Sequence, residues 1–182
     1  MRHAATLALV LTTLAAPVCA QGFTGHARVV DGDTLDVEGT RVRMFGIDAP
    51  ESSQSCSDAA RAPYPCGRVA TEALASMVGG RPVTCEPRDR DRYGRVVAVC
   101  SVGGVDLNRW MVARGLAVAY VRYSTDYAAD EARARQGRLG LWAGEFQNPS
   151  DYRAANRGGY GGYGGPATGS FGGYGGYGNR RW

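Results

Sequence analysis

The stretch "VVDGDTLDVEGTRVRMFGIDAPE", residues 29–51, decides the fold of this 182-residue chain. Leu35 and Val37 alternate with acidic residues, which is typical of a strand that buries one face. Glycine-containing turns lie on both sides of it, so we expect neighbouring strands at residues 23–30 and 41–47. The stretch therefore predicts a meander of three short strands.

Four of the carboxylates in this stretch, Asp31, Asp33, Asp48 and Glu51, and one of its arginines, Arg43, are expected to lie close together. Asp31 and Asp33 alone would be ordinary in an exposed acidic turn. A tight hairpin, however, brings Asp48 and Glu51 back alongside Asp33. Carboxylates this close together repel one another unless a cation compensates their charge. Arg43 alternates with the apolar residues of its own strand, so it projects from the opposite strand face. The sequence therefore predicts a charged site with a cation at this end of the sheet.

The rest of the chain adds two strands and three helices. Apolar residues recur at helical spacing over residues 69–77 and end at a Gly-Gly pair. The other expected elements are strands at residues 82–88 and 95–101, a helix capped by Asp106, and a helix from Ser124 or Thr125 to about Gly137. Residues 48–67, rich in proline and serine, are expected to form a loop without regular structure. This pattern favours an α+β fold, a five-stranded OB-type β-barrel with three helices, over a doubly wound sheet.

The two ends of the chain differ in composition from the central domain, residues 21–156. Residues 1–20 contain an apolar run over residues 4–16, which is too short to span a bilayer and is followed by small residues before Gln21. We expect a secretory signal peptide cleaved after Ala20, and hence a secreted or periplasmic protein with no membrane span. A lipid anchor at Cys19 is less favoured. Residues 157–182 are rich in glycine and tyrosine and are expected to form a disordered tail.

The charge of the chain constrains how it could bind anions. The net charge is +4, but arginines and acids balance within residues 21–156, and the chain contains no lysine. Any anion site in the domain must therefore come from the arrangement of its charges. Every cationic side-chain contact to a phosphate, apart from histidine, would be a guanidinium, which is suited to bidentate binding.

Four motifs resemble the staphylococcal nuclease (thermonuclease) family: "DGDT", "VRMFGIDAPE", "DRYGR" and "GLAVAYVRYS". "DGDT" alone is weak and "GIDAPE" is fairly specific, but all four occur in order at family-like spacing. The resemblance covers residues 23–142, nearly the whole central domain. It implies calcium-dependent hydrolysis of phosphodiester bonds in DNA and RNA.

The resemblance also implies a calcium site. Asp33 and Asp48 correspond to carboxylate ligands of the ion, with the backbone carbonyl of Ala49 as a third ligand. Asp31 would act through water. Calcium takes oxygen ligands in flexible geometry and tolerates water among them, which suits such a set.

Three further residues would carry the chemistry. Glu51 corresponds to the general base that takes a proton from the attacking water. Arg43 and Arg95 would hold the phosphate and stabilise charge on its oxygens. The alternative is a non-catalytic OB-fold protein that binds single-stranded nucleic acid. Such a protein would be expected to lack at least one of these groups, so we favour the enzyme, acting as a monomer. A third alternative, an envelope structural protein whose tail is the working part, leaves the five-residue constellation unexplained.

Substrate-binding residues are implied at the edge of this site. They are Arg92, near the phosphates, and Tyr93 and Tyr120, whose rings would stack on bases. Stacking tolerates every base, as a nuclease of low sequence preference requires. Alternatively, the tyrosines could be packed at the rim of the barrel, an interpretation that suits Tyr120 better than Tyr93.

Four cysteines remain after the signal peptide, and an even number in an exported chain indicates two disulfides with three possible pairings. A zinc site is less favoured because no C-x₂-C pair occurs. A symmetric hairpin around "DRDRYG" would place Cys85 opposite Cys100. That leaves Cys56 to pair with Cys66 across the proline-rich loop.

Overall fold

The fold is described from a computed structural model, which covers residues 21–156. The expected signal peptide and glycine-rich tail lie outside the described residues. None of the helices in residues 21–156 is long and apolar enough to cross a membrane.

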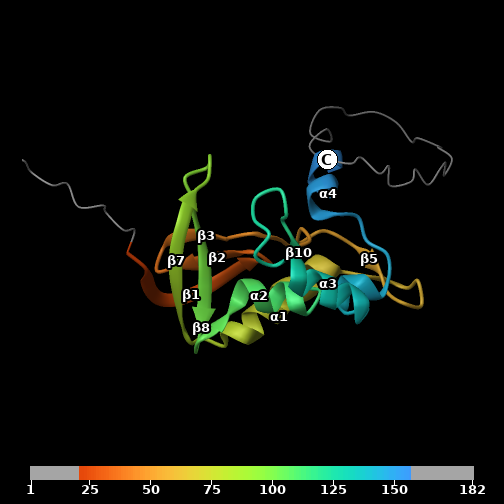
Figure 1. Ribbon diagram of the computed structural model, residues 1–182, viewed down its shortest axis with the longest axis horizontal. Coiled ribbons are helices and arrows are strands. Elements are labelled where there is room, and N and C mark those ends of the chain that lie inside the picture. Colours follow the sequence, from red (N-terminus) through yellow and green to blue (C-terminus); the bar gives the residue numbers. More distant parts are fainter. Residues whose placement is uncertain (1–20, 157–182) are drawn as a thin grey trace, which may run out of the picture.

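Five strands close into a barrel (Figure 1). They are β1 (Phe23–Asp31), β2 (Thr34–Val37), β3 (Thr40–Met44), β7 (Pro82–Arg90) and β8 (Val96–Val102). Neighbours pair antiparallel in the order β3-β2-β1-β7-β8, and a parallel pairing of β3 with β8 completes the circle. The five-stranded OB-type barrel predicted from the sequence is confirmed.

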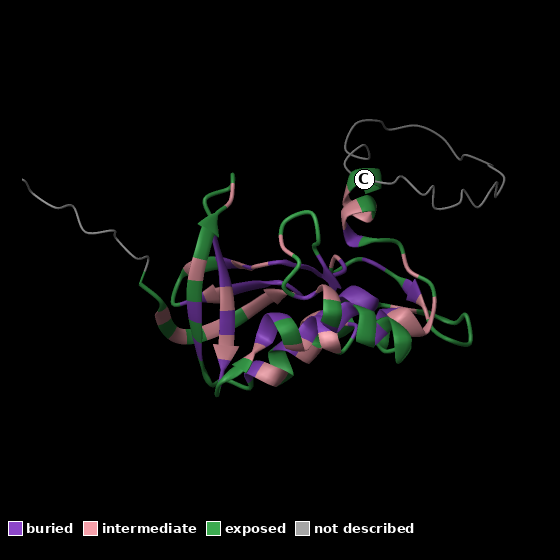
Figure 2. Ribbon diagram, in the orientation of Figure 1, coloured by how far each residue is buried: buried purple, intermediate pink, exposed green. Residues whose placement is uncertain are grey.

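The interior of the barrel follows the alternation seen in the sequence. Leu35, Val42, Val83 and Ala98 are all buried in one core cluster. Figure 2 shows buried and exposed residues alternating in the first half of β7, whereas the residues of β8 are buried or partly buried. Helices α1 (Cys66–Val78) and α2 (Leu107–Ala113) cover the barrel and contribute Leu74 and other apolar side chains to this core.

The third expected strand is shorter than predicted. It ends at Met44 instead of Ile47, because Gly46 adopts a φ of +70° and turns the chain. A Cβ at Gly46 would also lie 3.0 Å from the Tyr127 ring. After this turn a separate strand, β4 (Ile47–Asp48), pairs with β10 (Val118–Ala119). The turn therefore moves Asp48 out of the barrel sheet and to its rim.

The described residues contain four α-helices, one more than predicted. They are α1 (Cys66–Val78), α2 (Leu107–Ala113), α3 (Ala128–Gln136) and α4 (Pro149–Asn156), with a 3₁₀ helix at Gly140–Ala143. Asp106 caps α2 as expected, by accepting a hydrogen bond from the Arg109 N–H. The predicted start of α3 was wrong, because the helix begins at Ala128. The hydroxyl of Ser124 accepts a hydrogen bond from the Asp126 N–H in a turn ahead of the helix and does not cap it.

The segment after Asp48 is also more ordered than predicted. Strands β5 (Cys56–Ser57) and β6 (Pro63–Tyr64) pair within the expected loop. The predicted disulfides Cys56–Cys66 and Cys85–Cys100 are both present. The β7–β8 register places Cys85 directly opposite Cys100, as the hairpin argument required.

Candidate active site

The acidic turn after β1 lies against the end of β4. Gly32 makes this possible, since a Cβ there would lie 2.7 Å from the Ala49 Cβ. The Ala49 N–H donates to Asp33 at 2.8 Å, and the Asp33 N–H donates to Asp31 at 3.0 Å. Asp33 and Asp48 are only 2% and 1% exposed, so both carboxylates are buried and need compensating charge.

Arg43 supplies part of that charge. It lies opposite Thr34 in the β2–β3 register and donates from one guanidinium nitrogen to Asp33 and from another to Asp48, the latter at 2.7 Å. From the sequence we expected Arg43 to hold the phosphate. In the structure Arg43 lines the cleft and is also paired directly with two of the acids, because both carboxylates are buried beside it.

Burial raises the pKa of Asp33 to about 7, although Arg43 acts in the opposite direction. The neighbouring carboxylates of Asp31 and Asp48 raise it further. A second cation beside Asp33 would therefore favour its ionised form. An ion with oxygen ligands would have this effect.

Glu51 lies on the loop that leads from β4 toward α1. Gly67 allows α1 to start against this loop, since a Cβ there would lie 1.7 Å from the Glu51 carbonyl oxygen. Gln54, which is buried, accepts from the Glu51 N–H at 3.3 Å and donates to the Gln147 carbonyl at 2.7 Å. The amide of Gln54 thus joins the backbone of Glu51 to the segment before α4.

Arg95 is positioned by Asp91 at the tip of the β7–β8 hairpin. The Arg95 Nε donates to one Asp91 oxygen at 2.6 Å, and the backbone N–H groups of Tyr93 and Arg95 donate to the other. Burial acts to raise the pKa of Asp91, but these hydrogen bonds outweigh it and the pKa is lowered. Sequence reasoning did not single out Asp91, although an aspartate at the start of a tight turn commonly binds backbone N–H groups.

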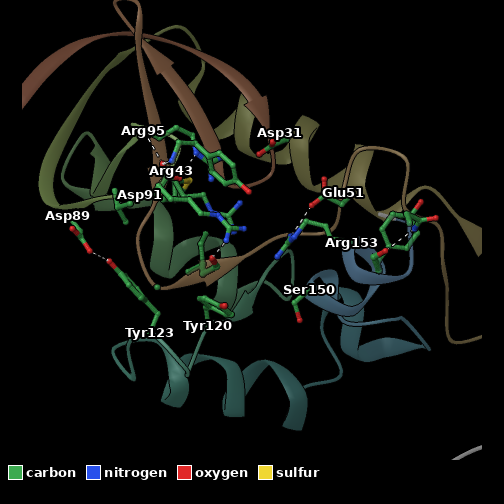
Figure 3. Close-up of a pocket in the computed structure, with 18 of the residues that line it drawn as sticks. Asp31, Arg43, Glu51, Asp89, Asp91, Arg95, Tyr120, Tyr123, Ser150 and Arg153 are labelled. Atoms are coloured by element: carbon green, nitrogen blue, oxygen red, sulfur yellow. Dashed lines mark hydrogen bonds and ion pairs between the residues drawn. The ribbon is translucent and has the colours of Figure 1, made fainter. Parts of the chain in front are cut away.

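The charged residues border a cleft of about 1060 Å³ (Figure 3). Of the residues named from the sequence, those that line it are Asp31, Arg43, Glu51, Arg92, Tyr93, Arg95 and Tyr120. The structure thus brings seven of the ten predicted site residues to one surface. Asp33 and Asp48 lie buried behind Arg43, and the Ala49 N–H contacts Asp33 there.

Exposed aromatic rings also line the cleft. Tyr93 is 69% exposed, and the Arg92 guanidinium lies 4.9 Å from the centre of its ring. Tyr120 is partly exposed, and Tyr123 donates its hydroxyl to Asp89. These rings are available for stacking and are not packed in the barrel core.

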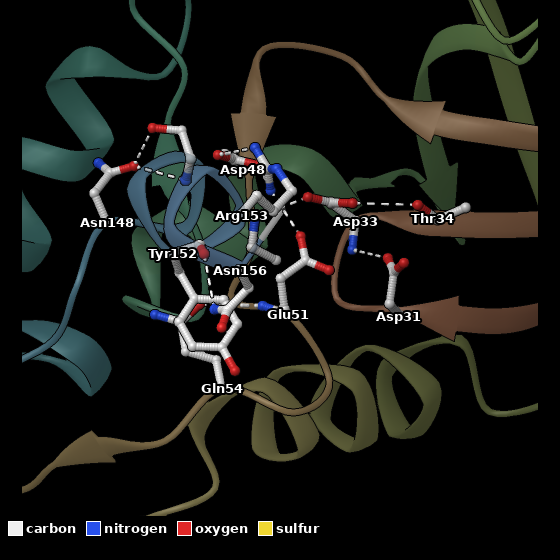
Figure 4. A network of polar contacts seen from close by, with 12 residues as sticks. Asp31, Asp33, Thr34, Asp48, Glu51, Gln54, Asn148, Tyr152, Arg153 and Asn156 are labelled. Atoms are coloured by element: carbon white, nitrogen blue, oxygen red, sulfur yellow. Dashed lines mark hydrogen bonds and ion pairs between the residues drawn. The ribbon is translucent and has the colours of Figure 1, made fainter. Parts of the chain in front are cut away.

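Arg153, on α4, is the principal residue that the sequence argument missed. Its Nη1 donates to Asp48 at 2.9 Å and to Glu51 at 2.8 Å, and its Nη2 donates to the second oxygen of Asp48 at 2.9 Å (Figure 4). A signal for the helix was present, since Asn148 followed by Pro149 is typical of an N-cap and first helical position. In the structure Asn148 accepts from the Ser150 N–H.

The carboxylate oxygens of Asp33 and Asp48 are of the type that calcium binds, and in this structure they are paired with Arg43 and Arg153. Within residues 21–156 no group of three His, Cys, Asp or Glu side chains has the geometry of a metal site. The expected ligand set has only two carboxylates, with a backbone carbonyl and water. Two buried carboxylates neutralised by guanidinium groups are consistent with a site that takes a cation.

The sequence model for staphylococcal nuclease homologues matches residues 41–144 of this chain. The chain belongs to the staphylococcal nuclease family. It is 36% identical over 143 residues to an uncharacterized endonuclease of Escherichia coli, covering 74% of this chain and 87% of that protein. It is 34% identical over 172 residues to the micrococcal nuclease of Shigella flexneri, covering 84% of this chain and 92% of that protein.

A third relative of the family has a different name. The succinoglycan biosynthesis protein ExoI of Rhizobium meliloti (strain 1021) is 40% identical over 129 residues, which cover 68% of this chain and 66% of ExoI. The staphylococcal nuclease family and the relatives named as nucleases support a phosphodiester-hydrolysing nuclease. Arg153 lies beyond the residues that the family model matches.

Proposed function

We propose that this protein is an exported, calcium-dependent nuclease that hydrolyses phosphodiester bonds of DNA and RNA with little sequence preference. The observation that carries the proposal is the convergence of Arg43, Glu51 and Arg95 on one cleft, directly in front of buried Asp33 and Asp48.

Each group has a role that its position supports. Asp33, Asp48 and the carbonyl of Ala49 would hold calcium, with Asp31 acting through water. The ion would polarise a phosphoryl oxygen and favour ionisation of nearby water. Glu51, whose side chain is 37% exposed, lines the cleft and would accept a proton from the attacking water.

The two arginines would hold the phosphate and stabilise the charge that builds on its oxygens. Arg95 is well prepared for this role because its Nε is fixed by Asp91, which leaves its terminal nitrogens to face the cleft. Arg43 would share its guanidinium between the buried acids and the phosphate. Since both residues are arginines, bidentate contacts to phosphate are possible at each position.

The aromatic residues that line the cleft support cleavage with low preference for base sequence. Tyr93 and Tyr120 offer ring faces to bases, and Arg92 lies beside Tyr93. Ring stacking and phosphate contacts do not read base edges, so they act on DNA and RNA of any sequence.

Export is part of the proposal, and the two disulfides support it. Disulfides persist in oxidising compartments such as the periplasm and the extracellular space. A secreted or periplasmic monomer would meet DNA and RNA there as substrates. The alternative, a non-catalytic single-strand binder, would not need Glu51 and Arg95 beside a buried acidic pair.

A cleavage assay tests the proposal. Purified protein is incubated with linear and nicked DNA and with RNA, in calcium, in magnesium or in chelator. We expect both nucleic acids to be cleaved in calcium, with cleavage abolished by chelator. Magnesium should substitute poorly, because it demands near-ideal octahedral geometry that two carboxylates and a carbonyl do not impose. Equal rates with either ion would contradict the calcium site, and binding without cleavage would favour the alternative.

A further inference from the structure

The guanidinium of Arg153 binds the carboxylate oxygens that the proposed calcium ion would need as ligands. Its two terminal nitrogens bind both oxygens of Asp48, and one of them also binds Glu51. Arg43 contacts the first of these Asp48 oxygens as well, at 2.7 Å. Both oxygens of Asp48 are therefore occupied by cationic N–H donors from the chain itself.

This arrangement depends on α4 being held against the Glu51 loop. The Tyr152 hydroxyl lies 3.2 Å from the Ser53 hydroxyl, and Gln54 donates to the Gln147 carbonyl at 2.7 Å. A β-bridge between Ser57 and Glu145 adds a third connection between the same two segments. These contacts place α4 beside the acids without using Arg153, so the helix can stay docked when the guanidinium moves.

The charges explain why a cation is needed at this position. Asp48 is almost fully buried, and so is Asp33. Arg43 pairs with both carboxylates, so its single positive charge cannot balance the two negative charges. A bidentate arginine–carboxylate pair is among the stronger hydrogen-bonded contacts in proteins. Calcium would bind Asp48 through the same oxygen lone pairs, so the ion and the Arg153 contact exclude each other.

We propose that Arg153 is an internal cation that occupies the calcium position in the metal-free protein and must leave Asp48 before calcium binds. The inference rests on the proposed calcium site and adds a residue that sets how much calcium the protein requires. The side chain of Arg153 is 31% exposed and lines the cleft, so a path out of the acidic pair is open to it.

Calcium titration calorimetry of the wild type and of Arg153→Gln tests this inference. We expect Arg153→Gln to bind calcium more tightly than the wild type. If the guanidinium occupies Asp48 in roughly nine of ten wild-type molecules, the gain is about ten-fold. Arg92→Gln is the matched control, because it removes the same charge from the same cleft without touching Asp48. It should change the affinity by less than about two-fold, as expected for an exposed, screened charge.

Thermal unfolding gives a second readout that does not require activity. In chelator, Arg153→Gln should melt at a lower temperature than the wild type, because Asp48 and Glu51 lose their partner. In saturating calcium the difference should shrink, since the ion replaces the guanidinium and binding stabilises the folded state.

Asp48→Asn separates failure of this inference from failure of the calcium site. If Asp48→Asn weakens calcium binding but Arg153→Gln leaves it unchanged, the role of Arg153 is overturned and the site stands. If calcium binding does not depend on Asp48, or neither the wild type nor Arg153→Gln binds calcium, the site and the inference both fail. Binding detected only in Arg153→Gln would support the inference strongly.

Discussion

The two walls of the cleft are built differently. On the barrel wall, Asp33 and Arg43 lie on or beside strands whose backbones are paired on both sides, and Asp48 is on a strand paired with β10. On the second wall, here called the flank, Glu51 lies on a loop and Arg153 on the short helix α4 (Figure 1). Side-chain bonds through Gln54 and Tyr152, with a single β-bridge, hold the flank in place.

This difference separates stability from chemistry. Changes in the barrel wall disturb paired strands and a buried core, so they should lower stability and activity together. Changes in the flank should alter the position of Glu51 and Arg153 while the barrel stays folded. Substitutions on each side of the cleft test this separation.

The largest effect is expected when a catalytic group is removed from either wall. Glu51→Gln on the flank and Arg95→Ala on the hairpin should each lower the turnover rate by roughly 10²–10³, the usual cost of losing one group that stabilises the transition state. Single-turnover cleavage of a labelled oligonucleotide measures this. Arg28→Gln, which changes an exposed arginine paired with Asp36, is the control and should retain the full rate. Full activity in either catalytic variant would remove that residue from the mechanism.

The two disulfides provide the direct contrast between the walls. Cys85–Cys100 joins β7 to β8 in the barrel, whereas Cys56–Cys66 closes the loop that follows Glu51. Replacing either pair by alanine should cost about 2–4 kcal/mol in the free energy of unfolding. Denaturant unfolding and cleavage rates are measured for both double variants.

The expected difference lies in how activity follows stability. In the Cys56→Ala/Cys66→Ala protein, activity should fall under conditions where the barrel is still fully folded. In the Cys85→Ala/Cys100→Ala protein, activity should be lost only as the barrel unfolds. Parallel loss of activity and structure in both proteins would show that the two walls do not behave separately.

Gln54 is the buried connection between the Glu51 loop and the segment before α4. Gln54→Leu removes the amide that binds the Glu51 N–H and the Gln147 carbonyl. Both groups are only partly buried, so the cost should be at or below the low end of the about 1–3 kcal/mol for a buried group left unpaired. We expect reduced stability and a lower rate, with unchanged affinity for a short oligonucleotide. Rate, unfolding and binding are measured on one preparation. Wild-type rate despite lowered stability would mean that the position of Glu51 does not depend on this bond.

The smallest effect is expected at the exposed rim. Tyr123 donates a hydrogen bond to Asp89, and this bond lowers the pKa of Asp89 and raises the pKa of Tyr123 to about 12. Tyr123→Phe should therefore raise the pKa of Asp89 toward its ordinary value. Because the pKa of Asp89 is depressed in the folded protein, any stabilisation exists above the unfolded pKa and disappears as the pH falls through the folded pKa. Carboxyl NMR titration checks the shift, and an unchanged pKa would contradict the contact.

The sequence predicted the barrel because its signals are local. Alternation around Leu35 and Val42 is visible within a few residues, and the Cys85–Cys100 pairing follows from the symmetry of one hairpin. The end of β3 was missed because it depends on Gly46, whose turn is fitted to a distant Tyr127 ring. The start of α3 was missed because a serine can cap a helix or close a turn equally well.

The site was predictable where motifs carry it and not where distant segments meet. Asp33, Asp48, Glu51 and Arg43 lie in one stretch of sequence, so their proximity follows from one hairpin. Arg153 is 105 residues from Asp48 in the sequence, and its helix has only eight residues, too few for a clear helical period. Only the folded chain shows that this arginine reaches the acids.

The most direct test of the calcium site is the calcium dependence of cleavage by the wild type and by Asp48→Asn. Initial rates on one labelled single-stranded DNA are measured across a series of free calcium concentrations in the same buffer. We predict a saturable increase with calcium for the wild type and, for Asp48→Asn, a midpoint at much higher calcium or no activity. The same calcium midpoint in both proteins, or undiminished cleavage in chelator, would contradict the account.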